Sequence, residues 1–243
     1  MTEWLGKRYW LVGASDGLGA ALAQQLSRAG AEVVLSARSE DKLTALADSL
    51  PAKAEVVAMD VTDDTSVAAA TKAVGQVDGI VYLAAAYWPF GAKDWNAEQA
   101  NTMVDVNFMG LMRVMGQVVP DMVARNAGHI VVISSLAGFR GQARSIGYSA
   151  SKAATISLAE SMHADLRDTD VHVQVVNPGF IKTGLSDKND FKMPGMMEPE
   201  DAAREVFEHM NTDDFKKSFP FGMALAFRLG QFLPAALYYR IFK

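Results

Sequence analysis

Short apolar segments alternate with longer amphipathic segments along most of this chain. The apolar segments are four to six residues long, which is typical of strands buried on both faces, and they cover 9–12, 33–36, 56–59, 80–83, 130–134 and 171–176. Between them, the pattern predicts helices over 18–29, 42–49, 66–74, 97–125 and 148–167. Strands that alternate with helices in this way predict an α/β fold with a doubly wound parallel sheet and helices on both faces.

No linker, repeat or low-complexity segment interrupts the 243 residues, so residues 1–243 are expected to form a single domain. Two segments fall outside the alternating pattern. Residues 184–198 are irregular, and residues 219–243 are densely apolar but broken by Arg228, Gln231, Pro234 and Arg240. The N-terminal residues lack the apolar core of a signal peptide, and no run approaches the ~20 apolar residues that span a bilayer.

The composition excludes several classes of protein. The net charge of -5 gives no basic surface for nucleic acid, so no nucleic-acid partner is expected. The absence of cysteine rules out disulfides, thiol catalysis and zinc–cysteine sites, and it fits a reducing compartment, so a cytoplasmic location is expected. The four histidines are scattered without metal-ligand spacing, and no metal site is expected.

Three glycines follow the first predicted strand, in Val12-Gly13-Ala14-Ser15-Asp16-Gly17-Leu18-Gly19. Glycines allow a tight turn and let the backbone approach a pyrophosphate, while the N-terminus of the next helix offers free N–H groups. The spacing is G-x-x-x-G-x-G rather than the commoner G-x-G-x-x-G. The turn is therefore a candidate dinucleotide site, and a glycine-rich turn without a ligand is the alternative.

Two residues after later strands bear on which dinucleotide is bound. Arg38 stands 19 positions after Gly19, where a carboxylate usually meets a free ribose 2′-OH. An arginine suits a 2′-phosphate, which favours NADP over NAD, although Asp16 and nearby acids count against it. Asp60, after the third strand, could accept a hydrogen bond from an adenine amino group or serve as a capping or turn aspartate.

Tyr148 and Lys152 stand four positions apart on a predicted helix and can therefore reach one small volume. A tyrosine titrates near ~10, and lowering its pKa by about three units requires roughly 4 kcal/mol. An ammonium at about 4 Å supplies on the order of 4 kcal/mol. Lys152 is therefore predicted to lower the pKa of Tyr148 and make it a usable acid or base. Taken alone, the pair also fits a solvated helix face.

Six motifs together resemble the short-chain dehydrogenase/reductase family. They are VGASDGLG at 12–19, DVTD at 60–63, VNFMG around Asn107, ISS at 133–135, YSASK at 148–152 and NPGFIKT at 177–183, and 13 residues separate Ser135 from Tyr148. The resemblance covers roughly residues 7–183 and implies a Rossmann-like dinucleotide-binding fold. Two positions depart from the family pattern: Tyr82-Leu83-Ala84-Ala85 replaces an NNAG run, and Val12 replaces a threonine.

The resemblance implies a role for each matching position. Tyr148 is similar to the general acid that protonates a carbonyl oxygen, and Ser135 to the donor that fixes that oxygen. Lys152 is similar to the residue that binds the nicotinamide ribose, and Asn107 to the one that holds a water in a proton relay. The implied cofactor-binding residues are Gly13, Ser15, Gly17, Leu18, Gly19, Arg38, Asp60, Val61, Ala84, Tyr148, Lys152, Pro178, Gly179, Ile181 and Thr183.

These features predict an NADP-dependent oxidoreductase that interconverts a carbonyl compound and an alcohol. The alternatives are an NAD-dependent alcohol dehydrogenase using the same site and a non-catalytic dinucleotide sensor, against which the complete set of catalytic residues argues. In the family, the segment after Thr183 closes over the substrate. Met193, Met196 and Met197 within 184–198 therefore predict a lid for an apolar substrate, and packing of these methionines on the core is the alternative.

The apolar extension at 219–243 allows three interpretations. It could pack in a subunit interface or cap the substrate site, which are the favoured two, or lie on a membrane surface with its basic residues at the headgroups. The family commonly pairs its long helices between subunits, so a homodimer or homotetramer is expected.

Overall fold

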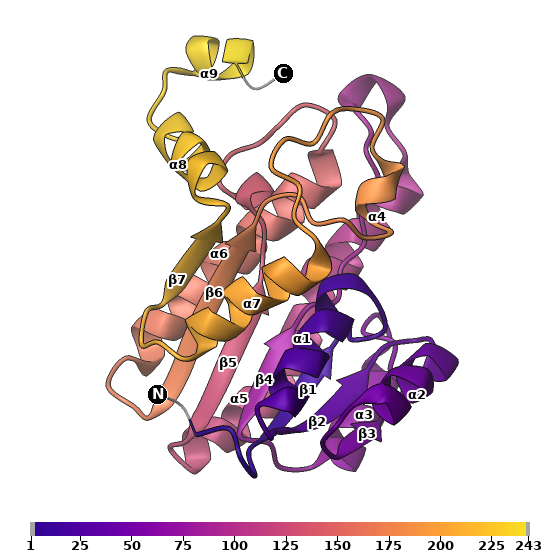
Figure 1. The fold of residues 1–243 in the computed structure, drawn as a ribbon. Coiled ribbons are helices and arrows are strands. Elements are labelled where there is room, and N and C mark those ends of the chain that lie inside the picture. The colour runs from indigo at the N-terminus through magenta and orange to yellow at the C-terminus, as the bar shows by residue number, and fades with distance from the viewer. Residues whose placement is uncertain (1–2, 242–243) are drawn as a thin grey trace.

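The computed structural model describes residues 3–241, so Phe242 and Lys243 of the predicted apolar extension lie outside it. In these residues seven parallel strands form one sheet in the order β3-β2-β1-β4-β5-β6-β7 (Figure 1). The strands are β1 (Arg8–Val12), β2 (Glu32–Ser36), β3 (Ala54–Val56), β4 (Gly79–Tyr82), β5 (Gly128–Ile133), β6 (Val171–Pro178) and β7 (Lys216–Phe219). The predicted doubly wound α/β fold is confirmed. The strand order reverses between β1 and β4, where such sheets open a crevice at their carboxyl ends.

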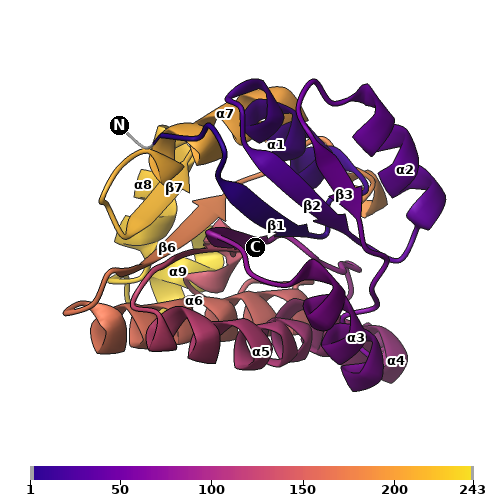
Figure 2. The ribbon, with the colours of Figure 1, turned by 90° about the horizontal axis from the view of Figure 1, so that it is seen from below.

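Helices cover both faces of the sheet. They are α1 (Gly17–Arg28), α2 (Glu40–Ser49), α3 (Asp64–Val74), α4 (Ala97–Val104), α5 (Gly110–Ala124), α6 (Ile146–Leu166), α7 (Pro199–Met210), α8 (Phe221–Gly230) and α9 (Ala235–Ile241). Figure 2 shows α1, α2 and α7 on one face and α3 to α6 on the other, while α8 and α9 follow the last strand. The loops that build the site are thus carried by a sheet covered on both sides.

The first strand shows why the apolar segments are nearly continuous. Trp10 and Val12 belong to the core under α5, where Leu111 is buried. The alternate residues Tyr9 and Leu11 belong to the core under α1. Because successive side chains point to opposite faces, a strand covered on both sides must be apolar throughout.

The helix predicted over 97–125 is interrupted by one turn of π-helix at Asp105–Met109. The wider turn frees main-chain carbonyl groups, and side chains from other elements take them up. The Tyr82 hydroxyl donates to the Val106 carbonyl over 2.7 Å, and Thr155 Oγ1 donates to the Asn107 carbonyl over 3.3 Å. The irregular turn therefore fixes Asn107 between the sheet and α6.

Two edges of the sheet differ from the prediction. The third strand is Ala54–Val56 rather than 56–59. Beyond it, the Val57 and Met59 amides still donate to the Leu35 and Ala37 carbonyls, but the chain turns away toward Asp60. The edge strand β7 was not predicted, because its sequence KKSF carries two charges and no apolar run.

Candidate active site

The loops at the carboxyl ends of the strands surround a cavity of about 880 Å³. All but one of the site residues predicted from the sequence line it: Gly13, Ser15, Gly17, Leu18, Gly19, Arg38, Asp60, Val61, Ala84, Ser135, Tyr148, Lys152, Pro178, Gly179, Ile181 and Thr183. Asn107 is fully buried and does not line it. Segments that lie up to 170 residues apart in the sequence, from Gly13 to Thr183, therefore share one cavity.

The glycine turn after β1 is packed too tightly for side chains. Gly13 has a φ of +97°, and a Cβ there would lie 2.4 Å from the Ala84 amide nitrogen. A Cβ on Gly19 would lie 2.2 Å from the Gly13 carbonyl oxygen, and one on Gly17 would lie 2.6 Å from Thr183 Cγ2. The bare backbone of this turn and the N-terminus of α1 therefore form part of the cavity wall, as a pyrophosphate group requires. The residues present fit a dinucleotide.

The backbone of Ala84, which matches the alanine of the NNAG pattern, lies against the glycine turn. Of the positions that depart from this pattern, Tyr82 is buried and its hydroxyl donates to the Val106 carbonyl in the π-helical turn. The loop after β4 is instead held from Asn107, whose Oδ1 accepts from the Ala86 amide over 2.6 Å and whose Nδ2 donates to the Ala86 carbonyl over 3.0 Å. The side chain of Asn107 thus takes over the positioning of this loop.

Asp60 forms a turn after β3, one of the two roles considered for it. Its Oδ1 accepts from the backbone amide of Thr62 over 2.9 Å and from the Thr62 hydroxyl over 2.8 Å. Partial burial raises the pKa of the carboxyl, but these bonds and the charges of Arg38 and Arg113 outweigh it and hold the pKa below its usual value. Arg38, exposed on the loop after β2, thus brings a positive charge to the same end of the cavity.

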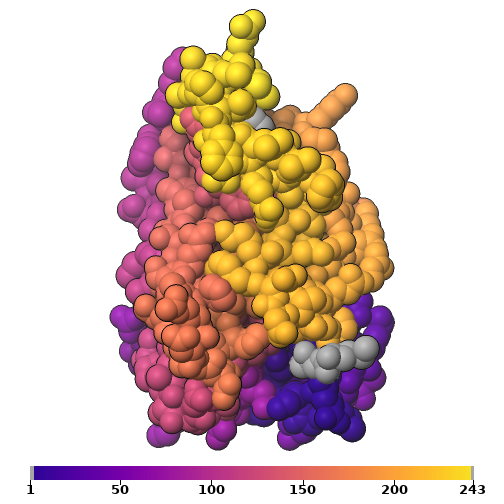
Figure 3. All heavy atoms as spheres, turned by 90° about the vertical axis from the view of Figure 1, so that its left-hand side faces the viewer, coloured from indigo at the N-terminus to yellow at the C-terminus, as the bar shows by residue number. Residues whose placement is uncertain are grey.

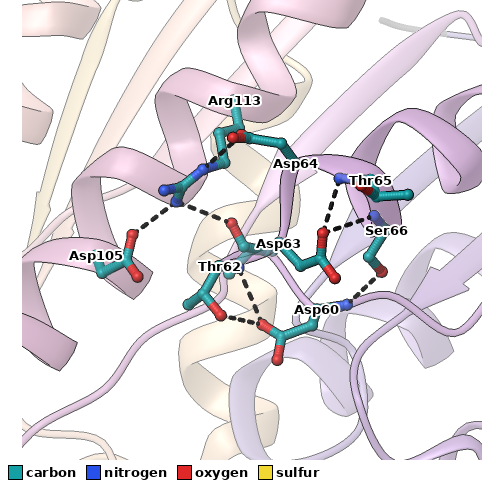
Figure 4. A network of polar contacts seen from close by, with 9 residues as sticks. Asp60, Thr62, Asp63, Asp64, Thr65, Ser66, Asp105 and Arg113 are labelled. Atoms are coloured by element: carbon teal, nitrogen blue, oxygen red, sulfur yellow. Dashed lines mark hydrogen bonds and ion pairs between the residues drawn. The ribbon is translucent and has the colours of Figure 1, made fainter.

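Arg113 on α5 ties this loop to the π-helical turn (Figure 4). Its guanidinium donates to Asp105 over 2.7 Å, to Asp64 over 2.8 Å and to the Val61 carbonyl over 3.2 Å. Asp63 caps α3 by accepting from two amides of its first turn. Val61, which lies in the cavity wall, is thereby held by Arg113 on one side and by the capped start of α3 on the other.

Lys152 lies on the buried side of α6. Its Nζ donates to the Ile133 carbonyl at the end of β5 over 2.9 Å, and the Ser134 hydroxyl donates to the Lys152 carbonyl over 2.9 Å. Burial lowers the pKa of the Lys152 ammonium to about 8. The lysine therefore changes charge about one pH unit above neutral rather than more than three.

Tyr148 lies one turn before Lys152 and lines the cavity beside Ser135. Burial raises the pKa of its phenol, and a hydrogen bond with the Ser135 side chain opposes this only in part. Lys152 Nζ is 5.8 Å from the centroid of the Tyr148 ring. The predicted lowering of the Tyr148 pKa is therefore wrong in direction for this structure, because burial outweighs the hydrogen bond with Ser135. The phenol stays protonated at neutral pH and can act as a proton donor.

The Asn107 side chain bonds both to the loop after β4 and to α6. Besides the Ala86 backbone, its Nδ2 donates to the Ser151 hydroxyl over 3.0 Å, and Ser151 in turn donates to the Tyr148 carbonyl over 2.9 Å. The side chain is thus committed to positioning the loop after β4 and the turn of α6 that carries Tyr148. The water-holding role implied by the family resemblance stays a prediction.

Tyr87 is a site residue that the sequence did not single out. Its ring packs edge-on against the ring of Tyr148, with centroids 4.9 Å apart. Its hydroxyl donates to Asn189 Oδ1 over 2.7 Å, and burial raises its pKa to about 12. Tyr87 therefore links Tyr148 to the segment 184–198. A lone tyrosine in the run AAAYWPF carries no motif, so the sequence offers no signal for this role.

The segment 184–198 lines the cavity and is bonded to the rest of the protein near its middle and at its base. Near its middle, Arg144 forms a two-pronged ion pair with Asp190 at 2.8 and 3.0 Å, and Lys188 donates to the Tyr87 carbonyl over 2.9 Å. At its base, the Lys182 amide donates to the Met197 carbonyl over 2.9 Å. The segment lies where a lid would, and its closing over substrate stays a prediction.

The methionine lining predicted for this segment is wrong. The lid residues in the cavity wall are Gly184, Leu185, Ser186, Asn189, Phe191, Lys192 and Pro194. Met197 packs instead on the core under α1, and the Met193 sulfur accepts from Asn189 Nδ2. Within the lid Phe191 is the aromatic residue in the wall, and other large apolar side chains come from outside it: Tyr87, Trp88, Phe180, Met223, Phe227 and Ile241. Three of these belong to the C-terminal extension, which therefore helps to cap the cavity.

Comparisons with known proteins agree with this geometry. The family model described as short chain dehydrogenase matches residues 7–193. This chain belongs to the short-chain dehydrogenase family. The resemblance inferred from the motifs is thereby confirmed, and the chain is an oxidoreductase of that family.

Relatives match over nearly the whole chain. A protein of Myxococcus xanthus described as an uncharacterized oxidoreductase is 36% identical over 98% of this chain and 97% of its own length. A solved short chain dehydrogenase/reductase family protein superposes with a TM-score of 0.80 at 26% identity and covers 89% of this chain and 96% of its own. A short-chain dehydrogenase from Sphingobium yanoikuyae in complex with NADPH has a TM-score of 0.83 at 24% identity, covers 92% of this chain and 91% of its own, and supports the fold.

Proposed function

We propose that this chain is an NADP-dependent oxidoreductase that interconverts an apolar carbonyl compound and the corresponding alcohol. One observation carries the proposal: Tyr148, Ser135 and Lys152 lie in the wall of the same cavity as the bare glycine turn after β1. A proton donor and a dinucleotide site in one enclosed volume are what reduction of a carbonyl by hydride transfer needs.

The residues divide the work as follows. The bound nicotinamide supplies the hydride. Tyr148, kept protonated by burial, donates its proton to the carbonyl oxygen, and Ser135 positions that oxygen by hydrogen bonding. Lys152 binds the ribose and attracts negative charge that develops near Tyr148. Asn107 and Tyr87 hold the Tyr148 turn and ring in place.

NADP is proposed over NAD because Arg38 supplies a positive charge where a 2′-phosphate would lie. Of the acids that count against this choice, Asp16, Glu40 and Asp41, Asp16 has partners of its own. Lys42 Nζ lies 3.8 Å from its Oδ2, and its Oδ1 accepts from the Gly17 amide over 2.7 Å. Solved neighbours such as the Sphingobium yanoikuyae dehydrogenase were obtained with NADPH. The apolar substrate class is proposed from the aromatic and aliphatic side chains around the cavity.

The test is the loss of reduced-nicotinamide absorbance with a panel of aldehydes and ketones, run with NADPH and with NADH. Arg38→Asp should raise the KM for NADPH and lower that for NADH, because it repels a 2′-phosphate and can bond a free 2′-OH. Arg28→Asp, at the far end of α1, is the matched control and should leave both constants unchanged. Turnover with no member of the panel would reject the activity, and unchanged constants in Arg38→Asp would reject the cofactor assignment.

A further inference from the structure

The C-terminal extension, residues 219–243, carries a dense group of exposed apolar side chains. Phe221 is 79% exposed, Leu229 60% and Phe232 85%. Leu225, Leu237, Tyr239 and Ile241 add to the same extension, and each is more than 40% exposed. Figure 3 shows α8 and α9 gathered at one end of the molecule, where they project beyond the body. We call this surface the tail face.

The extension is anchored to the body rather than detached from it. Arg140, on the loop after β5, donates to the Gly230 carbonyl over 2.9 Å and to the Leu233 carbonyl over 2.8 Å. Its guanidinium lies 4.2 Å from the centroid of the Tyr238 ring, and Tyr238 is fully buried. The inner side of the extension is therefore fixed, and the exposed apolar residues are held outward by a defined structure.

The net charge of the extension is opposite in sign to that of the rest of the chain. Residues 219–243 contain three of the 23 basic residues and none of the 28 acidic ones, so they carry +3 while residues 1–218 carry -8. Arg228 and Arg240 are exposed, and within residues 3–241 neither forms an ion pair. The tail face is therefore both basic and apolar. It is complementary to a surface that carries anionic groups over an apolar interior.

We propose that the tail face binds the surface of an anionic lipid bilayer. The apolar side chains enter the boundary between headgroups and acyl chains, and Arg228 and Arg240 meet the anionic headgroups. The contact is peripheral, because among residues 3–241 no helix has the length and apolar character to cross a bilayer. A second copy of this chain fits less well, since pairing two tail faces would bring four unpaired arginines together.

Binding of the tail face to a bilayer would also place the apolar end of the cavity next to the lipid. Ile241 is 58% exposed on the tail face and lines the cavity as well, together with Met223 and Phe227 from α8. The apolar end of the cavity therefore opens beside the surface that contacts lipid. Apolar molecules dissolved in the bilayer would reach it without crossing water.

The experiment is flotation of the full chain with vesicles of phosphatidylcholine alone and of phosphatidylcholine with phosphatidylglycerol. The chain should float with the anionic vesicles, and salt should weaken the binding. The triple variant Phe221→Gln, Leu229→Gln, Phe232→Gln should bind at least tenfold less, and none of these residues lines the cavity. The matched control, Leu5→Gln with Trp95→Gln, removes apolar residues that are 77% and 59% exposed elsewhere and should bind as the unaltered chain does.

Circular dichroism and the unfolding midpoint show that the variants are folded, and light scattering gives their mass in solution. Arg228→Gln with Arg240→Gln should weaken binding to anionic vesicles severalfold and leave the weaker binding to neutral ones unchanged. No flotation of the unaltered chain, or equal flotation of the folded triple variant, would overturn the proposal. A triple variant that floats normally but falls to a smaller oligomer would assign the tail face to a subunit interface instead.

Discussion

At the scale of the residue, the chemistry depends on two groups whose pKa values burial moves in opposite directions. Burial raises the pKa of the Tyr148 phenol and lowers that of the Lys152 ammonium to about 8. The tyrosine stays protonated as pH rises through 8, whereas the lysine loses its charge. A loss of activity in this range therefore reports on the lysine.

We expect kcat/KM for carbonyl reduction to fall above pH 8, approaching about tenfold per pH unit. In Lys152→Arg the guanidinium does not titrate in this range, so the falling limb should disappear even if the overall rate drops. Lys188→Arg is the control, because Lys188 also lies near the cavity and its pKa is also lowered by burial. A limb that persists in Lys152→Arg would show that another group titrates.

The residue types at the site could be predicted from the sequence, but their surroundings could not. Tyr148 and Lys152 are four residues apart on one helix, and Ser135 follows the end of a strand. The motifs therefore suffice to predict that these three side chains lie together. The direction of the Tyr148 pKa shift depends on how many atoms exclude water from it. The role of Tyr87 depends on a ring contact across 61 residues, which no local pattern encodes.

At the scale of the element, the turn between β1 and α1 depends on backbone that only glycine can supply. Gly13→Ala should lower the free energy of unfolding by more than about 2 kcal/mol, because its φ is +97° and the new Cβ would overlap the Ala84 backbone. Urea unfolding measures the change, and titration with NADPH should show weakened binding.

Gly116→Ala in α5 is the matched control. Gly116 is exposed, and a Cβ there would meet no atom within 4 Å. An alanine should therefore stabilise the helix by about 0.5–1 kcal/mol. Equal effects of the two substitutions would contradict the account of the turn.

Elements with a periodic pattern could be predicted from the sequence, and irregular ones could not. The helices predicted over 18–29, 42–49 and 66–74 correspond to α1, α2 and α3. The π-helical turn at Asp105–Met109 exists because tertiary partners take up its freed carbonyls, and nothing in DVNFM specifies it. The extension was predicted to be apolar but not helical, since α8 and α9 are apolar over most of their circumference.

At the scale of the whole molecule, the candidate active site and a polar network that stabilises the fold lie at opposite ends of the sheet. The cavity lies at the carboxyl ends of the strands, while a buried polar network lies near the start of β5. The Tyr9 hydroxyl is 2.9 Å from His129 Nδ1, and His129 Nε2 is 2.9 Å from Gln174 Oε1. Gln174 Nε2 lies within 3.0 Å of the carbonyl oxygens of His209 at the end of α7 and of Thr212 and Asp214 before β7. The network thus joins three strands at the end away from the site.

This network should make stability depend on pH. Burial lowers the pKa of His129 to about 4, whereas an unfolded histidine titrates near ~6.5. Between these values the unfolded chain binds the extra proton, so stability contributed by neutral His129 is complete above ~6.5 and is lost as pH falls toward 4. The loss is on the order of 3 kcal/mol.

Urea unfolding at several pH values from 7 to 4.5 measures this loss. His129→Gln should be less stable at pH 7 and show a smaller further loss on acidification. His172→Gln, on the exposed side of β6, is the control. The same pH dependence in His129→Gln as in the unaltered chain would exclude His129 as its source.

The proposed reaction depends on the Tyr148 hydroxyl, which would exchange the proton beside a bound dinucleotide. The most direct measurement compares turnover and NADPH binding in Tyr148→Phe, which removes one oxygen and keeps the ring that packs on Tyr87. We expect the rate to fall by at least about a hundredfold, while NADPH affinity, measured by fluorescence titration, changes little. Full turnover in the folded Tyr148→Phe chain would contradict it.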